Sequence, residues 1–161
     1  MQHSRNTLLK SRFALVRRDL DPLLDRISPE TLSWSPAEGM RTVSGQIVEI
    51  VSTEMQIIAR LKEGKWISDE EAKEIIGDCG SVENLRRALV EFRKQTFDYL
   101  DSLSQEELAE EVPFDGGWFA SLMLPTVPRA EVFLNIADHE WYHVGQLTTY
   151  LWALGHHPYD W

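Results

Sequence analysis

Apolar residues recur three or four positions apart through four long segments of the chain, which is the spacing that places them on one face of an α-helix. These segments cover about residues 5–26, 42–63, 81–100 and 128–154. Four helices that each bury one apolar face against the others form a bundle. We therefore predict an all-α fold, a four-helix bundle that occupies residues 1–161 as a single domain.

The connections between these segments carry signals for shorter elements. Ser68 and Ser104 are each followed three positions later by Glu, the pattern of a capping box at a helix start. Residues 111–128 contain several Pro and Gly residues, which forbid a long helix there. Within this stretch, Trp118–Leu124 could be extended but has no evident partner strand. We expect short extra helices in the connections and no sheet.

Charge and composition exclude some classes of partner. The 161 residues include 16 basic and 26 acidic ones, for a net charge of −10, which repels nucleic-acid backbones and anionic lipids. No apolar run is long enough to span a bilayer, and residues 1–10 lack the apolar core of a secretory signal. The single cysteine, Cys79, lies in a Gly-flanked turn and is interpreted as an incidental thiol in a reducing compartment. We expect a cytoplasmic protein with no direct nucleic-acid or membrane partner.

The sequence His139-Glu140-Trp141-Tyr142-His143 has the form H-E-x-x-H within the last long helix. Histidines four positions apart lie on one helix face, so their imidazoles can bind one metal ion. A third protein ligand is expected, and His3, His156 and His157 are poorly placed to supply it. The second helix offers the carboxylates of Glu49 and Glu54. Periodicity places Glu54 inside the apolar stripe, where a carboxylate must be paired or metal-bound, so the pattern alone favours Glu54.

The motif does not indicate a zinc protease in this chain. The extended protease form requires glycine where Gln146 stands, and Asp160 is the one acidic residue after His143. Glu140, the general base in such enzymes, points about a quarter turn from the histidines, so we expect it on the helix surface or in a supporting role. Gln146 either orients a ligand or packs. We expect three tryptophans, Trp118, Trp141 and Trp152, in the core or an interface, with Trp118 as a candidate pocket wall.

Three motifs in order resemble the DinB/YfiT-like superfamily. They are Trp34-Ser35-Pro36-Ala37-Glu38-Gly39, then Thr42-Val43, then His139-x-x-x-His143-x-Gly145-Gln146-Leu147. The resemblance implies a four-helix bundle, often dimeric, with a divalent metal held by three histidines. Two of these match His139 and His143, and the third falls on Glu49, so a carboxylate replaces an imidazole. The resemblance thus favours Glu49, with Glu54 as the alternative ligand or a supporting acid.

The resemblance also implies a function. Relatives include thiol-dependent transferases and isomerases, so we expect a metal-dependent enzyme that activates a low-molecular-weight thiol or water for transfer chemistry on a small molecule. Alternatives are a metal-dependent hydrolase and a non-catalytic metal-binding dimer of the bacterial stress response. A site of two histidines and one carboxylate suits zinc or nickel, and also manganese or iron. We expect a homodimer, as in relatives.

Overall fold

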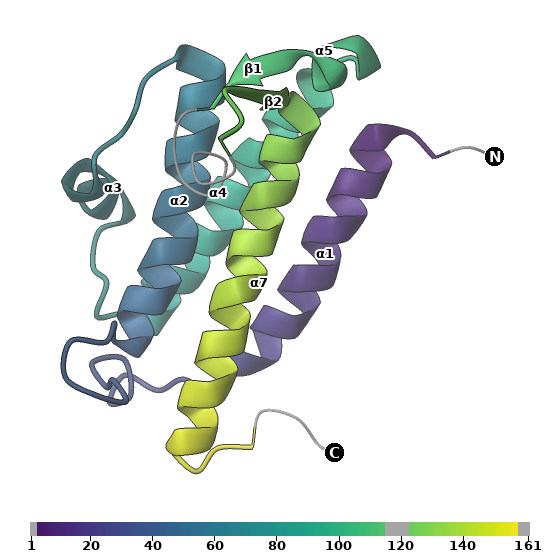
Figure 1. Ribbon diagram of the computed structural model, residues 1–161. Helices are drawn as coiled ribbons and strands as arrows, with labels where there is room; N and C mark the ends of the chain where they lie inside the picture. Colours follow the sequence, from purple (N-terminus) through teal and green to yellow (C-terminus); the bar gives the residue numbers. More distant parts are fainter. Residues whose placement is uncertain (1–2, 115–122, 158–161) are drawn as a thin grey trace.

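The computed structural model describes residues 3–114 and 123–157, and within these ranges the chain forms four long helices (Figure 1). The long helices are α1 (Arg5–Leu24), α2 (Val43–Glu63), α4 (Val82–Ser102) and α7 (Arg129–Ala153). Two short helices lie in the connections, α3 (Asp69–Ile76) and α5 (Gln105–Ala109). The predicted all-α bundle with short extra helices is confirmed.

The helix ends follow the polar residues that the sequence places there. Ser4, Thr42 and Ser81 cap α1, α2 and α4, each accepting a hydrogen bond from a backbone N–H in the first turn. At the other end of α2, Gly64 has a φ of 67°, a left-handed conformation that glycine adopts without steric cost. The capping boxes of α3 and α5 are both present. Local hydrogen bonding therefore sets where these helices begin.

The four long helices bury their apolar faces in one shared core. Helix α1 packs along α7, and α2 lies between α7 and α4. Figure 1 shows that α1 and α7 run in one direction while α2 and α4 run in the other; the segment with α3 carries the chain back along the bundle from α2 to α4. The largest fully buried side chains come from all four long helices; among them are Phe13, Ile50, Leu89 and Phe133. This arrangement sets one face of α2 opposite the middle of α7.

A small sheet joins the end of α5 to the start of α7. Strands β1 (Glu111–Pro113) and β2 (Thr126–Pro128) pair antiparallel, with Val112 opposite Val127. The expectation of no sheet is wrong, because strands of three residues are too short to show an alternating pattern. The proposed extended segment Trp118–Leu124 falls largely outside the described residues, as does Trp118 itself.

The described helices include no candidate for a membrane span, since none combines the necessary length with the necessary apolar character.

Candidate metal centre

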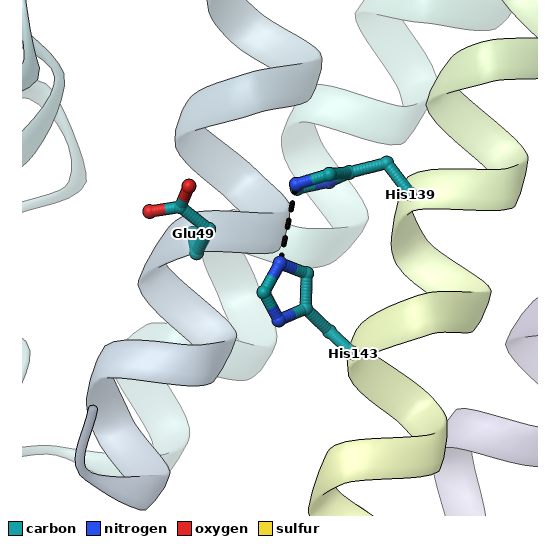
Figure 2. A group of neighbouring side chains, drawn as sticks. All are labelled: Glu49, His139 and His143. Carbon is teal, nitrogen blue, oxygen red and sulfur yellow. Dashed lines mark hydrogen bonds between the residues drawn. The ribbon is translucent and has the colours of Figure 1, made fainter. Parts of the chain in front are cut away.

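Helices α2 and α7 bring the three predicted ligands to one place. Glu49 lies on the second turn of α2, and His139 and His143 lie one turn apart on the facing side of α7 (Figure 2). One potential ligand atom from each of the three residues lies within 4.8 Å of the other two. Within the described part of the chain, this is the group of histidine and acidic side chains with the spacing of a metal site.

A chain of hydrogen bonds fixes the orientation of His143. Its Nδ1 contacts the Gln46 side-chain oxygen, the Gln46 amide nitrogen donates to the Tyr150 hydroxyl at 3.0 Å, and that hydroxyl donates to the Arg41 carbonyl oxygen at 3.1 Å. An amide oxygen only accepts hydrogen bonds, so Nδ1 carries the proton of the neutral ring. The Nε2 lone pair of His143 is therefore directed away from Gln46, as in histidines that bind metals.

The two imidazoles face each other through the atoms that bind metals. Nε2 of His139 and Nε2 of His143 are 3.1 Å apart (Figure 2). Two bonds of about 2.0–2.1 Å at a tetrahedral angle would place two such nitrogens about 3.3 Å apart. The spacing of the nitrogen pair therefore fits a shared divalent ion.

Both imidazoles are held in the neutral form that binds metals. Burial, and to a smaller extent the neighbouring His143 and the positive charge of Arg41, together lower the pKa of His139 to about 4. Burial also lowers the pKa of His143 to about 4, with a contribution from Arg41. At neutral pH both rings are uncharged, so metal binding does not compete with protonation of either ring to imidazolium.

Glu49 lies at the solvent edge of this group. Its carboxylate forms an ion pair with Arg41, with Oε2 3.0 Å from Nη2, and its side chain is 32% exposed. The two histidines lie deeper, with His143 buried and His139 partly buried. A molecule from solvent would therefore reach the two histidine nitrogens from the side on which the Glu49 carboxylate lies.

Glu54, which periodicity favoured as a ligand, has other partners. Both of its oxygens accept hydrogen bonds from Arg93, from Nε at 2.8 Å and from Nη2 at 3.0 Å, and the Thr96 hydroxyl donates at 2.6 Å. The buried carboxylate is indeed paired, as a charge inside an apolar stripe must be, but its partner is an arginine of α4. The structure brings Glu49, and not Glu54, to the histidines.

Glu140 belongs to the same buried ion-pair network. It is 1% exposed and accepts a hydrogen bond from Arg17 of α1 at 2.8 Å and another from Arg93. The alternative that placed Glu140 on the helix surface is wrong, because the quarter turn that separates it from the histidines points it into the bundle. The two guanidiniums hold its pKa below the ordinary value despite burial. A carboxylate paired in this way is not placed to serve as the general base of a protease.

The remaining sequence candidates have different environments. Cys79 is partly buried, which raises the pKa of its thiol and disfavours the reactive thiolate. Trp141 packs half-buried against the core, with the Arg12 guanidinium 4.8 Å from its ring. Trp152 is 44% exposed, and Gln146 is half-buried one turn beyond His143.

Sequence reasoning missed three residues that shape the site. Gln46 precedes Glu49 by three positions, so it shares that helix face, and this spacing was the signal for it. Arg41 stands just before the Thr42 cap, where no periodicity applies. Arg93 lies beside Phe92 in the apolar stripe of α4, and an arginine in that place indicates a buried acidic partner.

Comparison with known proteins places the chain in a family. No curated protein matches it significantly. The crystal structure of YjoA, a DinB-like protein of Bacillus subtilis, is similar with a TM-score of 0.68 at 21% identity, over 92% of this chain and 93% of that chain. The sequence profile of the DinB superfamily matches residues 12–147, which include the entire candidate metal centre. The chain therefore belongs to the DinB superfamily.

Proposed function

We propose that the protein is a metal-dependent enzyme in which Glu49, His139 and His143 hold a divalent ion that activates a thiol or water for transfer chemistry on a small molecule. The observation that carries this proposal is the pair of neutral imidazoles whose Nε2 atoms face each other 3.1 Å apart beside a carboxylate at the solvent edge. Zinc and nickel fit this nitrogen and oxygen donor set best, and manganese and iron are further candidates.

The residues around the ligands have distinct roles in this proposal. Gln46 keeps the proton of His143 on Nδ1, and Tyr150 keeps Gln46 in place. A bound divalent ion would lower the pKa of a coordinated thiol or water, so that a thiolate or hydroxide is present near neutral pH. Because both histidines are largely buried, bulk water has little access to them. Substrate and thiol would approach on the exposed Glu49 side.

Activity assays with and without thiol test the proposal. Protein loaded with zinc or nickel is supplied with a low-molecular-weight thiol and a chromogenic aromatic chloride; sulfur replaces chloride on carbon, and the thiol proton and the chloride go to solvent. We expect saturable, metal-dependent turnover that His143→Ala abolishes. His156→Ala, which removes an exposed histidine just past α7, should retain full turnover.

The same assay separates the two nucleophiles. Metal-dependent hydrolysis of a chromogenic ester without thiol would assign activation of water instead of thiol. Metal-loaded protein that turns over neither class of substrate would contradict the catalytic proposal, while leaving metal binding to be judged from direct titration.

A further inference from the structure

Arg41 is positioned at the edge of the candidate metal centre by its backbone carbonyl group and its guanidinium. Its carbonyl oxygen accepts the hydrogen bond from Tyr150. Its Cβ and Cγ atoms lie beside Gly45 in the first turn of α2, 3.5 Å and 3.8 Å from the position that a Cβ would occupy at that glycine. Its guanidinium reaches Glu49 at 3.0 Å. The residue is therefore built into the site although it precedes the helix that carries Glu49.

The guanidinium of Arg41 is both exposed to solvent and electrostatically close to both histidines. The side chain is 55% exposed, and its charge acts on His139 and on His143. A divalent ion bound beside the Arg41 guanidinium would place two positively charged groups together, and the single negative charge of the Glu49 carboxylate would not neutralise them. The charge of Glu140 also acts on His139, but this acid faces the interior, where two arginines, Arg17 and Arg93, already pair with it. The entrance is thus locally cationic in a chain of net charge −10.

We propose that the small molecule bound at this centre carries a carboxylate group, and that Arg41 binds this carboxylate while the metal binds the reacting atom. The inference rests on the proposed function. A guanidinium presents paired N–H donors in the geometry of a carboxylate, and it is the side chain best suited to bind one at an exposed edge. The competing interpretation is that Arg41 acts only on Glu49 and positions that ligand.

Binding of two thiols to cobalt-loaded protein tests this inference without an activity assay. The probes are 3-mercaptopropionate, which has a carboxylate, and 2-mercaptoethanol, which has none; coordination of either is followed by the sulfur-to-cobalt charge-transfer absorption. We expect Arg41→Gln to weaken 3-mercaptopropionate about tenfold, the scale of one charge-assisted hydrogen bond, and to leave 2-mercaptoethanol nearly unchanged. The carboxylate of 3-mercaptopropionate can also bind cobalt directly. Because this contribution is the same in both proteins, comparing the affinity of each thiol for wild type and for Arg41→Gln removes it.

Arg18→Gln is the matched control, because it removes the same charge from a side chain that is 72% exposed on α1. It should leave both thiol affinities unchanged, and circular dichroism should show native helix content in both variants. If Arg41→Gln alters cobalt affinity but weakens both thiols equally, Arg41 only positions Glu49 and the inference is overturned. Failure of 3-mercaptopropionate to perturb the cobalt spectrum of the wild type would also overturn it. A wild-type protein that takes up no cobalt would overturn the proposed function together with the inference.

Discussion

Adjacent residues of the segment His139–His143 have different roles because each residue along an α-helix is rotated by about 100° from the last. His139 and His143 face α2, where Glu49 and Gln46 lie. Glu140 faces the interior, between an arginine of α1 and an arginine of α4. The H-E-x-x-H sequence, which is also found in zinc proteases, therefore supplies two candidate metal ligands and one acidic residue of a buried ion-pair network in this bundle.

The role of Glu140 leads to a prediction about stability. Glu140→Ala leaves the partly buried Arg17 and the buried Arg93 with one carboxylate fewer, and loss of one partner from a buried ion pair costs about 3–5 kcal/mol of unfolding free energy. Urea denaturation measures this loss. Glu91→Ala, at an exposed position of α4, should change stability by no more than about 0.5 kcal/mol. Equal stability of the two variants would contradict the assigned network.

The lowered pKa of both histidines predicts how stability depends on pH in the metal-free protein. The unfolded chain takes up protons on these residues near pH 6.5, whereas the folded protein does so only near pH 4. Their neutral form therefore supports folding fully above pH 6.5, and this support is lost as the pH falls from 6.5 towards 4. Urea denaturation across this window should give a flatter pH dependence for His139→Gln/His143→Gln than for wild type. Parallel curves would show that the histidines are not buried as described.

Single-residue roles were only partly predictable from the sequence. The pattern of α2 correctly indicated that Glu54 is buried and needs a partner, but a pattern does not tell whether the partner is a metal or an arginine on a helix that is distant in sequence. Periodicity places Glu49 at the edge of the same stripe, and only the family resemblance pointed to it. The structure brings Glu49 to the histidines because α2 and α7 are antiparallel neighbours.

At the scale of elements, helix ends were predicted best because their signals are local. Thr42 accepts the Gly45 N–H at 3.0 Å and fixes the start of α2, just ahead of the residues that shape the site. The pair β1 and β2 was missed because its stability comes from hydrogen bonds between two segments that are not adjacent in the sequence, which leave no local pattern.

The cap of α2 gives a prediction for this scale. Thr42→Ala should lower the free energy of unfolding by about 1 kcal/mol, since it leaves a first-turn N–H without its side-chain acceptor. Thr42→Ser keeps the hydroxyl and should retain most of the stability. Chemical denaturation of the three proteins decides the matter: a loss that is the same for Ser and Ala would mean that the methyl group of Thr42, and not its hydroxyl, stabilises the helix.

At the scale of the whole molecule, the bundle assembles its site from residues far apart in the sequence. Gln46 and His143, which are separated by 97 positions, come into direct contact across the interface of α2 and α7. Amphipathic patterns predict that four helices bury their faces together, but not which helices are neighbours. The pairing of α2 with α7 is the feature of the fold on which the candidate centre depends.

Metal titration of the purified, chelator-treated protein tests the central claim most directly. We expect wild type to bind one zinc or nickel ion per chain. Mutation of a residue that only hydrogen-bonds to a metal ligand typically weakens metal binding about 10–100-fold. Glu49→Ala and His143→Ala each remove a ligand itself, so we expect each to weaken binding by more than that. The exposed-residue variants Glu63→Ala and His156→Ala should bind as wild type does. Wild-type protein that binds no divalent metal, or a Glu49→Ala variant that keeps full affinity while Glu54→Ala loses it in folded protein, would contradict the account.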